Sequence, residues 1–379
     1  MAIQEFCSTR YVVGCGCLER LSELRGERVA LVVSETVIRA LGLEKRLYEE
    51  ILKDVEYKVI GDVSREPSMA MLAEPIKEVQ EFEPTCIVAI GGGSVIDSAK
   101  AMWLFYELPH YTWEDAFAAY AVEKFPGKAK FIAVPTTSGT GSETTCCCMV
   151  KDDENVKQMI LSFEIVPTTA LLDYDLLRSL PPSNVAFSGT DALAHAFGAA
   201  VCSTTSELVQ AVAVQAIVML VKNLPASSKG DFEARKRVHV AATLAGQAIN
   251  NAITGLEHTL ATCAEVYDLP HGLVAGTLLP YVLRFQAPNP VYAEVAEQLG
   301  VPGEGVEQQM ALVERIWEMY DELGMPRTLQ AAGVPEDKYL ERIPRIVEEA
   351  AAGFALQTAP KVPTREEIEM LLKEFYYGI

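Results

Sequence analysis

The chain has 379 residues, of which 50% are hydrophobic and 22% are charged, and its formal net charge is −20. This length is enough for two domains with sizeable cores, and the strong negative charge gives no electrostatic support for binding nucleic acid. The nine cysteines include direct neighbours that pair poorly, so we expect a cytoplasmic protein rather than a disulfide framework. We expect neither a signal peptide nor a membrane role, because the most apolar stretch, 211–221, is too short to span a bilayer.

Short apolar runs alternate with helical patterns in the first half of the chain. A continuous apolar run typical of a buried strand lies at 29–33, further strands are expected at 57–60, 86–90 and 130–134, and helical spacing covers 38–52 and 70–82. Strands separated by helices in this order favour a parallel sheet with right-handed crossovers. We therefore expect an α/β domain over residues 1–180.

Strand patterns almost disappear after residues 180–183, and long Ala- and Leu-rich helical patterns follow. Ser183 is a suitable N-cap for the first of these helices. Further helices are expected at 206–224, 231–254, 306–323 and 365–377. We therefore expect a helical domain over residues 181–379.

Two loops rich in glycine or hydroxyl residues follow predicted strands. The first contains Gly91, Gly92, Gly93 and Ser94 and precedes a predicted helix, whose free N–H groups could bind a phosphate. A glycine triplet alone is often only a tight turn. The second loop, 135–143, has five hydroxyl residues at what we interpret as another strand-to-helix junction. Such a pair of loops, at the carboxyl ends of parallel strands, favours a dinucleotide site.

Glu35 follows the first predicted strand. A carboxylate there can accept hydrogen bonds from both ribose hydroxyls of an adenosine and would repel a 2′-phosphate. The residue therefore favours NAD over NADP, although a solvated loop glutamate is an equal alternative.

Four potential metal ligands occur in the second half of the chain. Asp191 and His195 are four residues apart and would share one face of a helix, and His258 and His271 follow in later segments. One oxygen and three nitrogen ligands suit Fe²⁺ or Zn²⁺ and leave room for an oxygen of substrate or water. Any one of these histidines alone would more often be a core residue.

The other two histidines receive no function. His110 lies in a predicted loop and His239 on a predicted basic helix face.

The sequence resembles the iron-containing (group III) alcohol dehydrogenases. The motifs that carry this resemblance are 91–97, 135–143, 189–196 and 270–272, in this order along the chain. The resemblance implies the architecture of dehydroquinate synthase-like proteins, with a Rossmann-like dinucleotide-binding domain, a helical domain, and cofactor and metal meeting in the cleft between them. It also implies that Asp191, His195, His258 and His271 are the metal ligands, and that Lys157 reaches the nicotinamide-ribose side. The implied cofactor contacts are Glu35, Gly92, Gly93, Ser94, Asp97, Thr136, Thr137 and Thr140.

Three positions depart from the family pattern. Many relatives carry a second histidine, used in a proton relay, where this chain has Thr262. A glutamate common three residues after the second ligand is Gly198 here, and a Pro-Asn-Pro loop is replaced at 65–68. We therefore expect a complete metal site with an altered proton path and substrate pocket.

The expected activity is hydride transfer between NAD(H) and a small primary alcohol, a diol or an ω-hydroxy acid, with the metal acting on the substrate oxygen. The resemblance also implies a homodimer or a larger homo-oligomer. Glycerol dehydrogenase is an alternative with the same fold. Dehydroquinate synthase-like cyclases lack the 135–143 motif, and maleylacetate reductases lack the acid at Asp191. A non-catalytic NAD-binding subunit is the remaining alternative.

Overall fold

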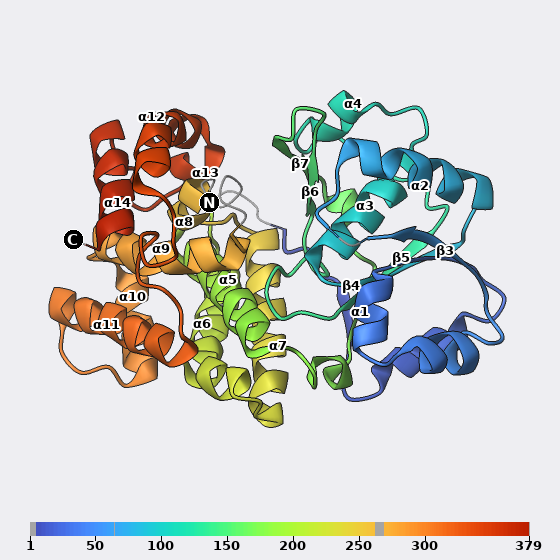
Figure 1. Cartoon of the computed structure of the whole chain (residues 1–379), viewed down its shortest axis with the longest axis horizontal. Coiled ribbons are helices and arrows are strands. Elements are labelled where there is room, and N and C mark those ends of the chain that lie inside the picture. Colours follow the sequence, from blue (N-terminus) through green and yellow to red (C-terminus); the bar gives the residue numbers. More distant parts are fainter. Residues whose placement is uncertain (1–4, 64, 262–268, 379) are drawn as a thin grey trace. The chain divides into compact units, whose positions relative to one another are not determined.

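The computed structural model of the protein describes residues 5–63, 65–261 and 269–378. The chain forms two compact units (Figure 1). The first, called the α/β unit here, covers Cys7–Ser179, and the second, called the helical unit, covers the chain from Leu180 together with the N-terminal residues up to Phe6.

The α/β unit is built on a six-stranded parallel sheet with the strand order β1-β8-β5-β4-β2-β3. Its strands are β1 (Arg10–Val13), β2 (Arg28–Val33), β3 (Glu56–Asp62), β4 (Cys86–Gly91), β5 (Lys130–Pro135) and β8 (Thr169–Leu172). The four predicted strands are β2, β3, β4 and β5. Because β2 and β4 lie inside the sheet and are buried on both faces, their sequences are continuously apolar. The predicted α/β fold class is confirmed.

Helices and a second, two-stranded sheet complete the α/β unit. The α-helices are α1 (Glu35–Ala40), α2 (Met69–Phe82), α3 (Gly93–Glu107) and α4 (Trp113–Phe117), and the antiparallel strands are β6 (Cys147–Lys151) and β7 (Lys157–Leu161). Further helical segments are Cys17–Leu24, Lys45–Ile51, Phe163–Ile165 and Tyr174–Leu177. The helix predicted at 38–52 is interrupted, because α1 ends at Ala40 and Gly42 adopts a φ of 64°.

The helical unit contains the predicted helices and several more. They are α5 (Pro182–Val201), α6 (Glu207–Ser228), α7 (Phe232–Asn250), α8 (Leu256–Leu260), α9 (His271–Gln286), α10 (Pro290–Leu299), α11 (Gly305–Leu323), α12 (Glu336–Ala352), α13 (Phe354–Gln357) and α14 (Arg365–Tyr377). Ser183 is not the N-cap of α5, which is Pro181. Pro182 occupies the first helical position, where its preset φ fits and its missing N–H costs nothing, so Ser183 falls inside the first turn.

Helix α6 is longer than its apolar core sequence suggested. It has 22 residues and is long and apolar enough, by length and composition, to cross a membrane, which corrects the expectation that this region is too short. Half of its most apolar window is buried inside the protein, and α6 packs against α5 and α7. A core helix of a helical domain has the same composition.

Candidate functional site

The four predicted metal ligands lie together in the helical unit. Asp191 and His195 come from the same face of α5, His258 comes from α8, and His271 begins α9. Asp191 Oδ1 is 3.5 Å from His258 Nε2, 3.8 Å from His271 Nε2 and 3.9 Å from His195 Nε2. Ligand atoms bound tetrahedrally to an ion at about 2.1 Å would be about 3.4 Å apart. The spacing therefore suits one divalent metal ion.

Because this cluster is buried, leaving its charged and polar atoms without partners costs free energy. The side chains of Asp191, His195 and His258 are 5%, 8% and 9% exposed, whereas that of His271 is 42% exposed. Among the residues that the structure describes, the buried atoms Asp191 Oδ1 and His258 Nε2 have no hydrogen-bond partner. Orphaned buried polar atoms of this kind are costly unless a ligand satisfies them. The donor set therefore fits a cation, and three of the four residues also form a group with metal-binding spacing.

The charges of the cluster perturb one another. Burial alone would raise the pKa of the Asp191 carboxyl, but the neighbouring imidazoles hold that pKa well below its usual range. Burial alone would lower the pKa of His258, but the carboxylates of Asp191 and Glu257 raise it to about 9. Asp191 therefore carries a negative charge that a metal ion can neutralise.

Close packing of α5 against α9 brings His271 to Asp191. A Cβ atom added to Gly272 would lie 2.1 Å from the carbonyl oxygen of Phe187 and 2.9 Å from Asp191 Cβ. The hydroxyl of Thr190 donates to the Gly272 carbonyl oxygen at 3.0 Å. Only glycine permits this approach, which explains the residue that follows the ligand His271.

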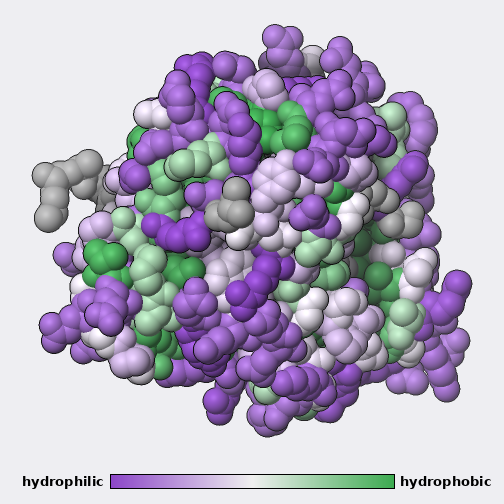
Figure 2. Space-filling model, turned by 60° about the vertical axis from the view of Figure 1, so that its left-hand side comes forward, coloured by the Kyte–Doolittle hydropathy of each residue, from purple (hydrophilic) through white to green (hydrophobic). Residues whose placement is uncertain are grey.

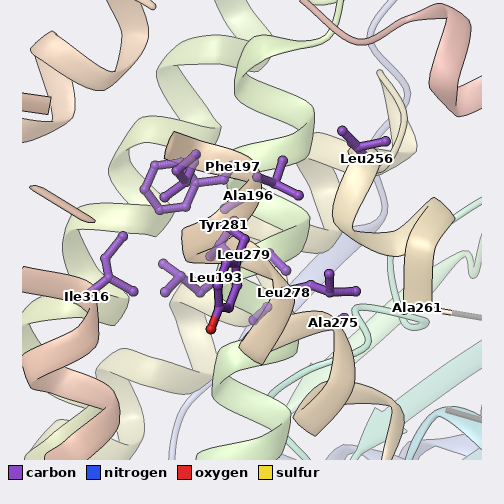
Figure 3. Packing of buried hydrophobic residues seen from close by; sticks show 14 of the residues in the cluster. Leu193, Ala196, Phe197, Leu256, Ala261, Ala275, Leu278, Leu279, Tyr281 and Ile316 are labelled. Carbon is purple, nitrogen blue, oxygen red and sulfur yellow. The ribbon is translucent and has the colours of Figure 1, made fainter. Parts of the chain in front are cut away.

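The apolar faces of the ligand-bearing helices form part of the core of the helical unit. Leu193 and Phe197 of α5, Leu256 of α8 and Leu278 of α9 belong to one buried cluster, part of which is drawn in Figure 3. These side chains are buried, at 0–1% exposure. The ligands are therefore held by rigid, packed helices rather than by loops.

Glu257, which precedes His258, was not among the predicted site residues. Its side chain is buried and its Oε1 lies 3.0 Å from His258 Nδ1. The same oxygen accepts a hydrogen bond from the Gly255 N–H at 3.1 Å. The available signal was a charged residue directly beside a proposed ligand in a buried segment. Thr262, on which the expectation of an altered proton relay rests, lies outside the described residues.

In the α/β unit, the predicted cofactor residues gather at the carboxyl edge of three adjacent strands. Glu35 follows β2, Gly92 follows β4 and Thr136 follows β5. The register pairs Val33 with Ile90 and Gly91 with Pro135. In open parallel sheets this edge is where ligands bind.

The two loops after β4 and β5 touch. A Cβ atom added to Gly92 would lie 3.4 Å from Thr137, and one added to Gly93 would lie 2.8 Å from Thr140. Gly92 is the N-cap of α3, whose first turn includes Ser94. Free N–H groups of this turn and threonine hydroxyls therefore lie side by side, as a pyrophosphate site requires.

The second loop does not lead into a helix, which corrects the expected strand-to-helix junction. After β5 the chain runs through an irregular loop into β6. The loop is held by its own hydroxyls: Thr144 Oγ1 donates to the Gly141 carbonyl at 2.8 Å, and Thr140 Oγ1 accepts from the Ser142 N–H at 3.3 Å. Such local bonds compete with helix formation.

Glu35 is held from two sides. The Tyr48 hydroxyl donates to Glu35 Oε1 at 2.8 Å, and the Glu35 N–H donates to Asp62 Oδ1 at 2.9 Å. Burial and the carboxylate of Glu35 raise the pKa of Tyr48, so its proton stays in this hydrogen bond. Neither Tyr48 nor Asp62 was predicted, because both contacts join segments that are distant in the sequence.

Asp97 contacts the small β6–β7 sheet, and Lys157 is part of it. Asp97 Oδ2 accepts from the Met149 N–H of β6 at 3.1 Å. Lys157 begins β7, and its Nζ is 2.9 Å from Glu66 Oε1. Glu66 also pairs with Lys151 at 2.8 Å. The loop at 65–68, whose sequence differs from the family pattern, therefore supplies the carboxylate that pairs with both lysines.

The two remaining histidines differ from each other. His110 is 63% exposed and lies in a turn, as predicted. His239 lies on α7 as predicted, but its side chain is buried rather than on a basic surface face, and burial lowers its pKa to about 4. The face was wrongly predicted because Arg235 on the same helix is also buried, where it donates to backbone carbonyls.

Comparisons with known proteins cover both units. Residues 8–174 match the family described as iron-containing alcohol dehydrogenase, and residues 185–376 match the C-terminal family of Fe-containing alcohol dehydrogenases. An alcohol dehydrogenase of Thermococcus barophilus is 36% identical over 97% of this chain and 98% of its own length. The NADPH-dependent butanol dehydrogenase of Clostridium saccharobutylicum is 33% identical over 96% of each chain.

Solved structures agree with these matches. An iron-containing alcohol dehydrogenase from Thermococcus thioreducens superposes with a TM-score of 0.89 at 34% identity, covering 99% of this chain and 100% of that one. The chain also matches several aldehyde-alcohol dehydrogenases, of whose length it spans less than half, between 43% and 44%.

Proposed function

The chain belongs to the family of iron-containing alcohol dehydrogenases, and we propose that it interconverts a small primary alcohol and its aldehyde with NAD(H) and one divalent metal ion. The observation that carries this proposal is the buried carboxylate of Asp191, with three imidazole Nε2 atoms within 3.9 Å of one of its oxygens. We propose Asp191, His195, His258 and His271 as the metal ligands. Fe²⁺ is our first choice from the family, and Zn²⁺ suits the same donor set.

The residues of the metal centre have separable roles in this proposal. When bound, the metal would supply a Lewis acid for the substrate oxygen and the nicotinamide would supply the hydride acceptor or donor. Asp191 would supply the negative charge of the ligand set, and the side chains of His195 and His258, which are 8% and 9% exposed, would be held in place by the packing of their helices. His271, with the most exposed side chain of the four, marks the side from which substrate would approach.

We propose that the α/β unit binds the dinucleotide. Gly92, Gly93, Ser94, Thr136, Thr137 and Thr140 would surround the pyrophosphate, and Asp97 and Lys157 would contact the nicotinamide half. In this scheme domains 1–180 and 181–379 bind the cofactor and the metal respectively. Lys157 would keep its ion pair with Glu66 and contribute through charge and position.

We propose NAD(H) as the preferred cofactor because two carboxylates would meet a 2′-phosphate. Glu35 is held in place by Tyr48, and Asp62 accepts from the Glu35 backbone. A phosphate there would face two negative charges. The relative from Clostridium saccharobutylicum is named as NADPH-dependent, so cofactor preference needs a direct measurement.

We propose a cytoplasmic homodimer or larger homo-oligomer that acts on small alcohols, diols or ω-hydroxy acids. Relatives are named as butanol and 1-propanol dehydrogenases, which makes short unbranched substrates the first to test.

The experiment is a matrix of initial rates. Metal-stripped protein is reconstituted anaerobically with Fe²⁺ or Zn²⁺ and assayed with propanal, butanal, 3-hydroxypropanal and succinic semialdehyde, using NADH and NADPH. We expect metal-dependent reduction of at least one aldehyde, with a higher kcat/KM for NADH. The absence of aldehyde reduction in every combination would contradict the proposed function, and a higher kcat/KM for NADPH would contradict the cofactor assignment.

A further inference from the structure

A second buried carboxylate stands behind the proposed metal centre. The Glu257 side chain is 2% exposed, and its Oε1 lies 3.0 Å from Nδ1 of His258. The other ring nitrogen, Nε2, lies 3.5 Å from Asp191 Oδ1. The imidazole of His258 is therefore held between two carboxylates, one at each nitrogen.

The backbone shapes a place for this carboxylate. Glu257 Oε1 accepts the N–H of Gly255 at 3.1 Å. A Cβ atom added to Gly198 would lie 2.9 Å from Glu257 Oε1 and 2.2 Å from the Gly255 nitrogen. The absence of a side chain at Gly198 thus leaves the room that the Glu257 carboxylate occupies.

We propose that Glu257 is a positioning residue that fixes the ring and tautomer of His258 so that Nε2 is available to the metal, an inference that rests on the metal-dependent function proposed above. The Nδ1–H donates to Glu257 Oε1, which leaves the lone pair on Nε2. A carboxylate in this place also makes the imidazole a more basic ligand. Gly198, where this chain departs from its relatives, makes the arrangement possible.

The charge balance supports a role beyond packing. A buried ionised carboxylate is costly unless it is paired and hydrogen-bonded. With a divalent ion bound, Asp191 and Glu257 together would balance its charge, while Asp191 alone would leave the centre positive. The pair of carboxylates therefore suits a divalent ion better than Asp191 alone does.

Two substitutions test the proposal against a matched control. Glu257→Gln keeps the shape and removes the charge, and Glu257→Leu removes the hydrogen bond as well. Glu107→Gln is the control, because Glu107 is also buried, at 1% exposure, and its carboxylate accepts three backbone N–H bonds in the α/β unit. Zn²⁺ affinity is measured by competition with a chromogenic chelator, and apoprotein folding by circular dichroism.

We expect the Zn²⁺ dissociation constant to rise by about 10-fold in Glu257→Gln and up to about 100-fold in Glu257→Leu. The control should lose thermal stability but keep its Zn²⁺ affinity within about twofold. Saturating Co²⁺ should give the Glu257 variants a visible absorption band that is shifted from the parent's, because a less basic His258 changes the ligand field.

Two results would overturn the proposal. One is Zn²⁺ affinity within about twofold of the parent in both Glu257 variants, and the other is an unfolded Glu257→Gln apoprotein, which would assign the residue to folding. If the parent itself binds no Zn²⁺ or Co²⁺, the proposed metal-dependent function fails first, and this outcome is recognised from the parent alone.

Discussion

Asp191 is the residue on which the proposed metal centre depends. Its Oδ1 faces the Nε2 atoms of three histidines from α5, α8 and α9 at 3.5–3.9 Å. A buried carboxylate next to imidazoles keeps its charge, and a metal ion bound there would replace protons as the compensating positive charge. Each imidazole would contribute one bond to the metal ion, so replacing any of the four proposed ligands should first lower the amount of metal that the protein retains.

His271 is the proposed ligand most suitable for a direct test. Because its side chain is 42% exposed, His271→Ala should fold normally yet lose metal affinity by more than the roughly 10–100-fold cost of losing an outer hydrogen-bond partner. Metal content after dialysis and turnover should fall together. His110→Ala, at a more exposed histidine outside the site, serves as the control. Full activity in a metal-free His271→Ala protein would exclude this residue from the centre.

Glu35 is the residue to test for cofactor preference. Glu35→Gln should weaken NADH binding and strengthen NADPH binding by roughly 10-fold, or about 1.4 kcal/mol, because one of two negative charges near the ribose is removed. Tyr48→Phe should weaken NADH binding while NADPH stays excluded, since the charge remains without its hydrogen bond. Fluorescence titration of both cofactors measures this. Equal affinities in the parent and Glu35→Gln would place the ribose elsewhere.

At this scale, the sequence predicted residues whose chemistry is visible locally. The spacing of Asp191 and His195 and the glycine loop could be interpreted without a fold. Glu257 and Tyr48 were missed because their roles depend on which atom meets which partner after packing, such as Glu257 Oε1 with His258 Nδ1. The spacing of residues in the sequence does not show which group will bond to the second nitrogen of an imidazole.

Among the elements, α5 and α9 decide the geometry of the site. Gly272 and Gly276 lie one turn apart on α9 against α5, and an added Cβ atom would reach Phe187 and Thr190 respectively. Gly272→Ala should force the helices apart and cost about 1–3 kcal/mol of stability, with weaker metal binding because His271 moves with the helix.

Gly276→Ala is the matched comparison for that substitution. It crowds Thr190 at 2.6 Å but lies one turn farther from His271, so it should lower thermal stability with a smaller loss of metal affinity. Denaturation and metal titration of both variants provide the test. A larger metal effect at Gly276 than at Gly272 would contradict the role given to α9 packing.

Helix α7 carries a pH dependence through His239. Burial lowers the pKa of His239 to about 4, whereas the unfolded chain binds a proton near pH 6.5. Between these values the unfolded state holds more protons, so stability falls as the pH drops, by about 2 kcal/mol at pH 5 from this group. His239→Leu should flatten the pH dependence of the unfolding free energy between pH 7.5 and 5. An unchanged slope would show that His239 is protonated in the fold.

Some helices and strands that are buried along most of their length could be predicted from the sequence. Strand β4 and helix α3 were predicted because a fully buried strand is continuously apolar and a glycine turn precedes the helix. Strands β1 and β8 were missed, since each has four residues and gives too short a pattern. A helix was wrongly predicted after β5. The hydroxyl groups of this loop form hydrogen bonds with the loop's own backbone, and these bonds compete with helix formation.

At the scale of the molecule, acidic residues exceed basic ones by enough to give a net charge of −20. Figure 2 shows hydrophilic residues over most of the face it presents, with smaller hydrophobic areas between them. Such a charge favours solubility and disfavours polyanions. It says little about a small neutral alcohol, so selectivity must arise locally, at the metal centre and the cofactor loops.

The most direct test of the central claim is a metal titration of the whole, metal-stripped protein. Fe²⁺ is added anaerobically in steps, and NADH-dependent butanal reduction is measured at each step, with Asp191→Ala treated in parallel. We predict that the rate of the parent rises linearly and levels off at one metal ion per chain, while Asp191→Ala neither retains metal nor turns over. Reduction that is independent of added metal, or metal retention unchanged in Asp191→Ala, would contradict the assignment of this centre.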